Sequence, residues 1–368
     1  MSSSHTSGSA RRTTSPLKKP SDFQISLCIP SSVISDSNAA NLEHITHIAY
    51  QIAKAATIYN VSEIVVLDIP SKKTREERTQ RANDIQINLQ GDSGNRKIKF
   101  GSSNDSQKQE KNQSAESTEL SHIGKNENNA LLLASFLQFF VTPKYLVRSV
   151  FRTNPYLKKF KYAEKLPKLS TLPFMNNNGV GNDFKEGFTV SKQAPKIRKK
   201  NKKVSAVKKL KVTKYVNVGD SKLLELSGPE VPTNVRVTVD VKNKRVVSPE
   251  LAYGISGCKA SFGYHVRLAR TVTSVFTESS HADGYTESIF VNADNYFGGA
   301  LETQIPKKEN DWQGKILMVI GNLRDLDYIF KQEMIDGVDS ITDMFDSELS
   351  VPSGLRIEDA ALVCLAKV

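Results

Sequence analysis

The sequence contains little cysteine: only Cys28, Cys258 and Cys364 among 368 residues. These three lie far apart and form no CxxC pair, which argues against a disulfide framework or a zinc site and fits a reducing compartment. The six histidines do not supply the missing ligands, because His44 and His47 share one helical face but have no third ligand of the right type nearby in sequence. We therefore expect no bound metal.

Several common signatures are also missing. There is no GxxxxGK run followed by Ser or Thr, so a P-loop NTPase is not expected. No GxGxxG follows a candidate strand, and no GxSxG elbow appears. No apolar run is long enough to span a bilayer, and residues 1–22 lack the apolar segment of a secretory signal. These absences argue against membrane insertion, secretion and the common phosphate-binding folds.

Positive charge is what the sequence has in excess. Lysine and arginine number 51 against 39 acidic residues, which gives a net charge of +12 and points to a polyanion such as nucleic acid. The densest run, at 196–214, contains no acidic residue. Its basic side chains are Lys196, Arg198, Lys199, Lys200, Lys202, Lys203, Lys208, Lys209, Lys211 and Lys214. The run predicts a solvated nuclear-import signal, a loop that follows RNA phosphates, or both.

Two apolar runs flank an amphipathic segment near the N-terminus. Residues 23–29 and 63–69 each have the pattern of a buried strand that ends before proline. Between them, apolar residues recur at steps of three and four, which predicts a helix capped by Asp36, Ser37 or Asn38. A strand, a helix and a second strand in this order predict a βαβ unit and a parallel sheet.

The rest of the chain changes character several times. Polar residues dominate 1–22 and 71–128, which predicts a disordered tail and a largely disordered insertion. Short alternating runs separated by Gly, Pro, Asn and Asp across 166–250 predict a small antiparallel barrel of the OB-like kind. Strand and helix patterns return afterwards, with a strong strand at 315–320 and a closing helix at 356–366.

Several segments resemble the SPOUT family of RNA methyltransferases, in the eukaryotic and archaeal branch that carries an OB-like insert. The resemblance rests on GYHVRLARTVTSVFTES at 263–279 and, in order along the chain, on SLCIPSSV, EIVVLD, ASFLQFFVTPKYLVRSVF, LPKLSTLPFMN, FKEGFTV and RIEDAALVCLA. It implies an α/β fold in which 23–165 and 251–368 form a trefoil-knotted parallel sheet. Residues 166–250 would then form an RNA-binding insert.

The resemblance also implies a cofactor, S-adenosyl-L-methionine, held in a bent shape by the knot loops. By position, the cofactor-binding candidates are Thr277, Glu278, Gly321, Asn322, Leu323, Leu326, Phe345, Leu349, Ser350 and Gly354. The positively charged sulfonium would favour a carboxylate, for which Glu278, Asp346 and Glu348 are candidates. Arg267 and Arg356 are the candidate catalytic residues, which would hold RNA phosphate or the substrate base. The alternative role for both arginines is an ordinary surface ion pair.

The chain also departs from the family pattern. Asp325 stands where a second glycine is usual, and Leu349, Ser350 and Val351 stand in place of a Pro-Gly-x-Gly run. Branched side chains tolerate few of the backbone shapes that glycine allows, so we expect S-adenosylmethionine binding to be weak or lost.

Two functional hypotheses follow. The first is an S-adenosylmethionine-dependent RNA methyltransferase that acts on a structured RNA such as ribosomal RNA. The alternative is a catalytically degenerate homologue that binds RNA or assists pre-ribosome assembly. Under either hypothesis we expect a nuclear, and more narrowly nucleolar, location. We also expect a homodimer, or a heterodimer with a paralogue, formed through the knotted domain.

Overall fold

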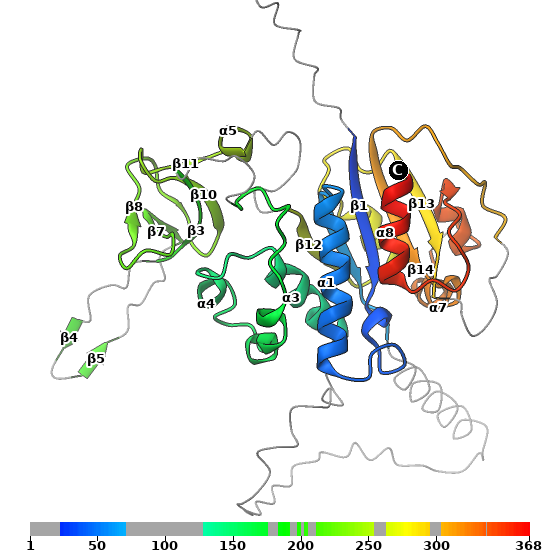
Figure 1. Cartoon of the computed structure of the whole chain (residues 1–368), viewed down its shortest axis with the longest axis horizontal. Coiled ribbons are helices and arrows are strands. Elements are labelled where there is room, and N and C mark those ends of the chain that lie inside the picture. The colour runs from blue at the N-terminus through cyan, green and yellow to red at the C-terminus, as the bar shows by residue number, and fades with distance from the viewer. Residues whose placement is uncertain are drawn as a thin grey trace, which may run out of the picture.

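The computed structural model describes residues 23–70, 128–175, 183–191, 197–199, 202–204, 211–253, 263–294, 303–335 and 337–368. The expected disorder of 1–22 and 71–127 lies outside these residues and stays a prediction. Figure 1 shows a central sheet covered by helices and, beyond one edge of it, a smaller group of strands. No helix in the described ranges combines the length and the apolar character needed to cross a membrane.

The central sheet has six strands, and every neighbouring pair in it is parallel. In spatial order the strands are β12 (His265–Ala269), β2 (Glu63–Leu67), β1 (Gln24–Pro30), β14 (Lys315–Gly321), β13 (Glu287–Asn292) and β15 (Ser347–Glu348). This arrangement confirms the predicted α/β class with a parallel sheet. The short β15 was not predicted, because two residues are too few to show an alternating pattern.

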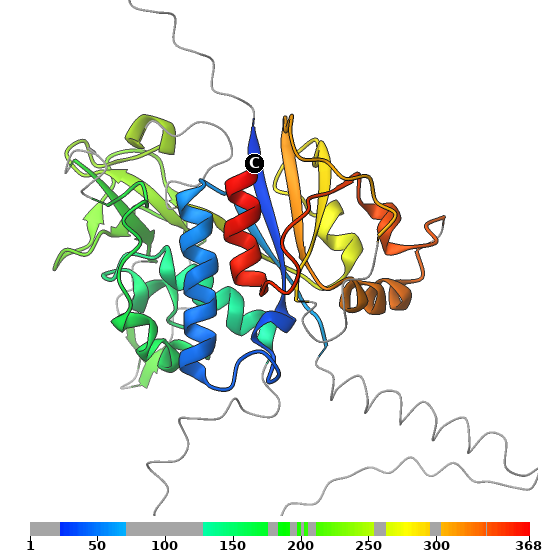
Figure 2. The ribbon, with the colours of Figure 1, turned by 45° about the vertical axis from the view of Figure 1, so that its right-hand side comes forward.

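Helices cover both faces of this sheet. Alternate strand residues point to opposite faces, so Leu27 and Ile29 of β1 join one hydrophobic core while Cys28 joins the other. The first core lies under α1 (Leu42–Ile58), α3 (Asn129–Phe140) and α8 (Ile357–Lys367). The second lies under α6 (Val272–Thr277), α7 (Leu323–Glu333) and the short η5 (Ile341–Met344). Figure 2 shows α1 and α8 side by side over the first face.

The first helix begins later than the sequence pattern predicted. A short 3-10 helix, η1 (Ser31–Ile34), follows β1, and α1 is capped by Asn41, whose side chain accepts a hydrogen bond from the amide of His44 (2.8 Å). The prediction of Asp36, Ser37 or Asn38 as the cap is therefore wrong. Aspartate, serine and asparagine are all good caps, so residue type alone does not choose among these four positions.

A segment between α3 and the insert joins the two parts of the molecule. It contains α4 (Val147–Val150), η2 (Leu157–Lys161) and η3 (Ala163–Lys165), and we call residues 141–175 the connector. The connector packs on α3 through aromatic rings: the Phe160 ring lies 4.6 Å from that of Phe139 and 5.4 Å from that of Phe136. The hydroxyl of Tyr264 donates to the carbonyl of Leu137 (2.8 Å), so the start of β12 is tied to the same helix.

The insert forms an antiparallel sheet, as predicted. Its strands, in spatial order, are β11 (Arg245–Val247), β10 (Arg236–Asp240), β3 (Phe184–Thr189), β7 (Tyr215–Asn217) and β8 (Leu224–Glu225). Two small pairs accompany them: β4 (Ile197–Lys199) with β5 (Lys202–Val204), and β6 (Val212–Thr213) with β9 (Val231–Pro232). A short α5 (Pro249–Tyr253) leads back toward the central sheet. Within the described residues this is half of a barrel, because β8 and β11 form open edges.

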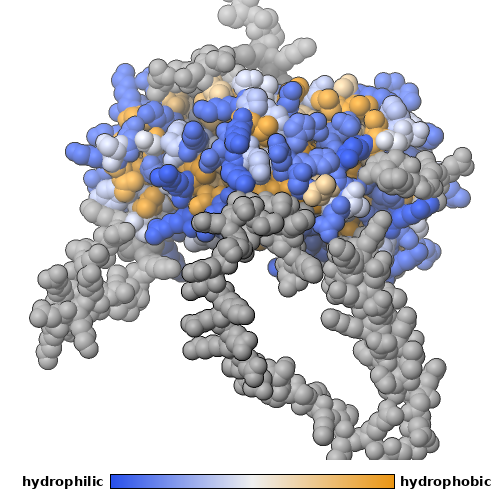
Figure 3. Space-filling model, turned by 60° about the horizontal axis from the view of Figure 1, so that its bottom comes forward, coloured by the Kyte–Doolittle hydropathy of each residue, from blue (hydrophilic) through white to orange (hydrophobic). Residues whose placement is uncertain are grey.

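The molecular surface is mainly polar on the face shown in Figure 3. Hydrophilic side chains dominate there, and apolar ones gather only in small separate patches. Large exposed apolar patches usually mark protein or membrane interfaces. On this face the features that remain are therefore polar and charged.

Candidate functional site

The C-terminal part of the chain passes between the strand β13 and the connection that follows β13. Glu348 of β15 pairs in parallel with Phe290 of β13. On its other side, the Glu348 amide donates to the carbonyl of Pro306 (2.8 Å), and its carbonyl accepts from the amide of Lys308 (3.1 Å). Residues 306–308 belong to the connection that leads from β13 to β14. The segment around β15 is thus enclosed between a strand and the chain that follows that strand.

Asp294 joins three loops at the carboxyl edge of the sheet. Its amide donates to the carbonyl of Leu355 (2.9 Å), and its carbonyl accepts from the side-chain amide of Asn322 (3.1 Å). Its carboxylate accepts from the side-chain amide of Asn38 (3.1 Å). The loops after β1, β13 and β14 therefore meet the segment before α8. In open parallel sheets, ligands bind at this edge.

The backbone of Asp294 is itself unusual. Its φ of 65° lies in the left-handed region, which residues other than glycine adopt at a cost and aspartate tolerates better than most. Such conformations gather at ligand-binding sites. The sequence interpretation missed Asp294, because it searched for glycines and for the family's loop positions. The available signal was the polar run that starts directly after the strand predicted at 288–291.

The first predicted cofactor loop, at 321–326, is shorter than expected. Gly321 ends β14, and Asn322 caps α7 by accepting a hydrogen bond from the amide of Arg324 (2.9 Å). Leu323 and Leu326 belong to the first turn of that helix, and Leu326 is buried in the core beneath it. Gly321 and Asn322 therefore remain at the edge, while Leu326 faces away from it.

The second predicted loop, at 345–356, divides into two parts. Phe345 stacks on Phe290 with ring centroids 5.2 Å apart, and the Leu349 side chain is 1% exposed within the core. Beyond this point the chain returns to the surface, where the Ser350 carbonyl accepts from the Lys367 ammonium (2.7 Å). Gly354 has a φ of 80° and open space where a side chain would be.

Both loops contact the chain that follows β13. The carbonyl of Gly321 accepts from the amide of Ala293 (3.1 Å), and the carbonyl of Leu355 accepts from the next amide, that of Asp294. Arg356 follows at the start of α8, and its guanidinium donates to the carbonyl of Asn38 (2.9 Å) and to the Glu358 carboxylate (2.6 Å). Arg356 therefore lies at the same convergence.

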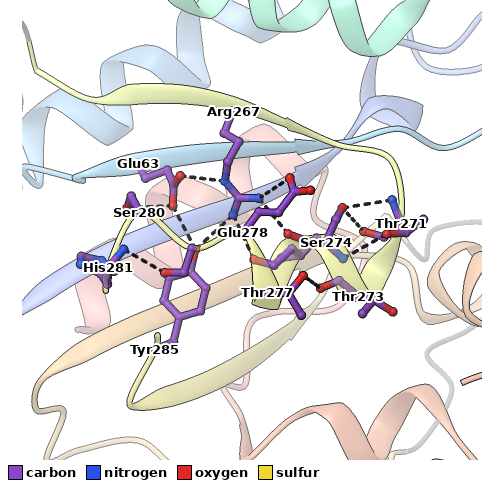
Figure 4. Close-up of polar contacts among 12 residues, drawn as sticks. Glu63, Arg267, Thr271, Thr273, Ser274, Thr277, Glu278, Ser280, His281 and Tyr285 are labelled. Carbon is purple, nitrogen blue, oxygen red and sulfur yellow. Dashed lines mark hydrogen bonds and ion pairs between the residues drawn. The ribbon is translucent and has the colours of Figure 1, made fainter. Parts of the chain in front are cut away.

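Arg267 lies elsewhere, on β12 (Figure 4). Its guanidinium donates to the Glu63 carboxylate (2.9 Å) and to the carbonyls of Ser274 (2.9 Å) and Val275 (3.0 Å) at the end of α6. Glu63 is buried, and it also accepts from the Tyr285 hydroxyl (3.0 Å). Burial and the neighbouring Glu63 charge raise the pKa of Tyr285 to about 12, so this hydroxyl stays a donor. These contacts give Arg267 a structural task, and its RNA-contacting role stays a prediction.

The remaining cofactor candidates lie beside Arg267. The Thr277 hydroxyl donates to the carbonyl of Thr273 (3.0 Å) within α6. The Glu278 carboxylate is 4.0 Å from the Arg267 guanidinium, and its side chain is 63% exposed. Because β2, β1 and β14 separate β12 from β13 in the sheet, this group and the Asp294 convergence are different places.

The other two candidate carboxylates are hydrogen-bonded to β13 and to the connection that follows it, and of the two Asp346 is exposed while Glu348 is buried. Asp346 accepts from both the amide and the hydroxyl of Ser288 (2.8 Å each). Glu348 is buried and accepts from the hydroxyl of Thr303. Asp294 is thus the carboxylate that the structure places at the edge. Among the described residues, no group of three His, Cys, Asp or Glu side chains is arranged to hold a metal.

The predicted RNA-binding run is described only in part. Arg198, Lys199, Lys202 and Lys203 lie on the β4–β5 hairpin, where Arg198 pairs with Lys203 and Lys199 with Lys202. Lys211 and Lys214 are exposed in the next described segment. The rest of the run, Lys196, Lys200, Lys208 and Lys209, lies outside the described residues.

Comparison with known proteins identifies the family. Residues 24–368 match the family described as "Putative RNA methyltransferase". A "Putative methyltransferase" of Saccharomyces cerevisiae is 33% identical over 91% of this chain and 90% of its own length. The "28S rRNA (uridine-N(3))-methyltransferase" of Drosophila melanogaster is 24% identical over 95% of this chain and 62% of its own. The human protein of that name is 23% identical over 94% and 77%. The chain therefore belongs to this family of RNA methyltransferases, which is of the SPOUT class.

Proposed function

We propose that this protein is an S-adenosylmethionine-dependent methyltransferase that modifies N3 of a uridine in large-subunit ribosomal RNA. Its membership of an RNA methyltransferase family supports the reaction class. The names of its fly and human relatives, which specify N3 of uridine in 28S ribosomal RNA, support the base, the atom and the RNA. The observation that carries the proposal for this chain is the convergence at Asp294.

The path of the C-terminal segment supports a trefoil knot. Residues 347–348 run between β13 and 306–308, and the chain then turns to α8, which packs against α1 and β14. A trefoil knot requires a segment that passes through the loop formed by another connection and then continues beyond it. Here that segment is β15, the connection is the one from β13 to β14, and the chain continues to α8 on the face that α1 covers. The backbone bonds of Glu348 to Pro306 and Lys308 on one side, and of the Leu349 amide to the Phe290 carbonyl on the other, would hold the knot closed. They would so fix the loops that the knot brings to the edge.

The groups at this edge suit S-adenosylmethionine in kind. The carbonyls of Gly321 and Leu355 and the side-chain amide of Asn322 bond to residues 293 and 294 and so fix the loops. Neighbouring main-chain groups of these loops would be the donors and acceptors for an adenine and a ribose. The Asp294 carboxylate offers a counter-charge for a sulfonium. When bound, the cofactor supplies an electrophilic methyl group. The task of the protein is then to hold that group and the uridine ring in line, which is catalysis by positioning.

The catalytically degenerate alternative rested on the side chains that replace the family's glycines. Leu349 is buried in the core, and Val351 packs against the same core, so neither side chain needs to occupy a cofactor pocket. Neither residue has a positive φ, so a glycine is not required at either position. Asp325 lies in the first turn of α7, where a negative charge favours the helix. These placements support the hypothesis of an active methyltransferase over that of a catalytically degenerate homologue.

We further propose that the insert binds RNA, with the β4–β5 hairpin contacting phosphates, and that the protein works in the nucleolus. Dimerisation through the knotted domain remains part of the proposal. The apolar face of α8 (Ile357, Ala360, Ala361, Cys364 and Leu365) is buried within the chain's own core. A dimer would therefore use other surfaces. Sedimentation at micromolar concentration tests it, and a monomer there would remove the dimer from the proposal.

The direct test is methyl transfer by the purified protein. We expect labelled methyl from S-adenosylmethionine to appear in large-subunit ribosomal RNA transcripts, and mass spectrometry of the digested RNA to locate it on N3 of uridine. Absence of transfer to every large-subunit segment, with the fold intact by circular dichroism, would overturn the proposed reaction.

A matched pair of ligands tests the role of Asp294. Asp294→Asn keeps a residue that tolerates positive φ and removes only the charge. We expect its affinity for S-adenosylmethionine to fall about five- to tenfold, or ~1 kcal/mol. Binding of the uncharged product S-adenosylhomocysteine should not change. Equal effects on both ligands would show that Asp294 does not serve the sulfonium.

A further inference from the structure

A cleft of about 830 Å³ lies between the connector and the insert. Lys144, Arg148 and Lys168 line its connector side. On the insert side it is lined by Phe184, Lys185 and the turn that contains Gly219. The cleft adjoins the start of β12, where a side chain at Gly263 would touch Leu172 of the cleft wall. It is therefore beyond β12, the edge strand of the central sheet that β2, β1 and β14 separate from β13. Figure 1 shows α4 of the connector on this side of the sheet.

The connector is strongly basic. Residues 144–168 contain eight lysines and arginines and a single acidic residue, Glu164. This charge is separate from the run at 196–214. Lys144, Arg148 and Lys168 are exposed, and none of the three forms an ion pair within the described part of the chain. Of the acidic residues that line the cleft, Glu186 and Asp220 are paired with Arg236 and Lys185. Lys144, Arg148 and Lys168 therefore outnumber the remaining carboxylate, that of Glu164, and positive charge in excess along a cleft attracts a polyanion.

Aromatic rings contribute to the same cleft. Tyr145 and Phe174 line it from the connector, and Phe184 from the insert. The Tyr145 side chain is 42% exposed, so part of its ring remains accessible. The Phe174 ring lies 5.5 Å from the guanidinium of Arg236 in a cation–π contact. Positive charge combined with exposed ring faces is the surface that binds unpaired nucleotides, because every base can stack on a ring.

The two walls of the cleft are held in place by direct contacts. The Tyr145 hydroxyl donates to the carbonyl of Glu186 (2.9 Å). The side-chain amide of Asn217 donates to the hydroxyl of Ser149 (2.8 Å). Glu186 is fully buried and is paired with Arg236 (3.2 Å). A preformed cleft spares a ligand the cost of ordering its site.

We propose that this cleft binds a single-stranded stretch of the substrate RNA, with phosphates on Lys144, Arg148 and Lys168 and bases against the aromatic rings. The volume lies within the range of pockets that hold compact organic ligands, so it suits a short stretch of unpaired nucleotides rather than a duplex. A-form duplexes present phosphates and hydroxyls but no free base faces for stacking. This inference rests on the proposed function and adds an anchoring site to it.

Salt-dependent RNA binding by the full-length protein tests the inference. The cleft variant is Lys144→Ala/Arg148→Ala/Lys168→Ala. Its control is Lys54→Ala/Arg270→Ala/Lys307→Ala, which removes three exposed charges outside the cleft. With a single-stranded oligonucleotide, the slope of log affinity against log salt should flatten by about 2 in the cleft variant, since each lost single-strand contact is worth about 0.7. The control slope should stay near that of the wild type.

Photo-crosslinking identifies the strand type and the site. An oligonucleotide that carries 4-thiouridine should crosslink to peptides containing Tyr145, Phe174 or Phe184, and single-stranded competitor should suppress this better than duplex competitor. Equal slopes in the two triple variants, or crosslinks confined to 196–214, would overturn the inference. Stronger competition by duplex than by single-stranded RNA would overturn the single-strand assignment.

Methyl transfer by the same proteins is measured in parallel, so that the cleft and the proposed reaction are tested separately. Methyl transfer by the wild type, with no effect of the cleft variant on RNA binding, would refute the cleft alone. An effect of the cleft variant on RNA binding, with no methyl transfer by the wild type, would refute the proposed reaction alone.

Discussion

The carboxyl edge around Asp294 and the cleft beside the insert are built in opposite ways. At the edge, loops distant in sequence are joined mainly by main-chain groups and amide side chains, as in the bonds of Asp294 to Leu355 and Asn322. In the cleft, cationic side chains such as Lys144 and Arg148 face solvent without an ion-pair partner in the described residues. The first arrangement suits a small ligand that must be oriented. The second suits a long polyanion that must be attracted, so one chain divides orientation and attraction between two regions.

The largest expected effect comes from replacing Leu349 with glycine, which the family pattern favours in this segment. Leu349→Gly removes a fully buried side chain, and we expect the free energy of unfolding to fall by about 3–5 kcal/mol. Cofactor affinity should not rise, because Leu349 lies in the core. Chemical denaturation and calorimetry measure the two quantities. Val351→Gly, at a half-buried position, should cost less, and a gain in affinity from Leu349→Gly would mean that the side chain does fill the cofactor site.

The second-largest effect on stability is expected at Arg267, one of the two candidate catalytic arginines. Arg267→Ala leaves the buried Glu63 carboxylate without its cation, which should cost about 3 kcal/mol or more. Arg356→Ala also leaves a buried carboxylate, Glu358, without its cation, but Glu358 lies in the first turn of α8, where a negative charge is favoured, so the cost in stability should be smaller. Thermal melts joined to methyl-transfer rates separate the roles. If Arg267→Ala lowered the rate while leaving the melting temperature unchanged, Arg267 would be a residue of the reaction instead of the framework.

A smaller effect is expected where the insert meets the connector. A Cβ at Gly219 would lie 2.6 Å from the Tyr145 ring, and Gly219 has a φ of 89°. Gly219→Ala should therefore cost about 1–3 kcal/mol and weaken RNA binding by displacing one wall of the cleft. Gly228→Ala is the control, since nothing lies within 4 Å of its Cβ position. Unchanged RNA affinity in a destabilised Gly219→Ala protein would argue that the cleft geometry does not matter to binding.

The smallest expected effect concerns pH. His281 is buried, and burial together with the Lys315 charge lowers its pKa below the usual 6.5, while Glu63 acts in the opposite direction. As pH falls through 6.5 the unfolded chain binds the proton first, so stability should decline below that pH. Denaturation curves between pH 5 and 8 measure this decline, and His281→Gln should make it shallower. An identical decline in the variant would assign the effect to other groups.

The parallel sheet could be predicted because β1, β2 and β14 are continuous apolar runs bounded by proline or glycine. The Asp294 convergence could not be predicted from local pattern. It depends on four segments meeting in space, and its residues are ordinary polar ones in sequence. The connector's charge was visible in the sequence but is spread over helices and turns, so the denser run at 196–214 concealed it. Leu349 was misread because a sequence does not show to which side of a chain a side chain turns.

The order of the strands also has a metric consequence. Four strand-to-strand steps separate β12 from β13, and at about 4.8 Å per step the sheet spans ~19 Å between them. An RNA anchored beyond β12 and a methyl donor held beside β13 would be at least that far apart. The width of the sheet would then set how many nucleotides separate the RNA stretch bound in the cleft from the modified uridine. If the separating stretch is shorter than this span, the reacting edge must belong to a second copy of the chain.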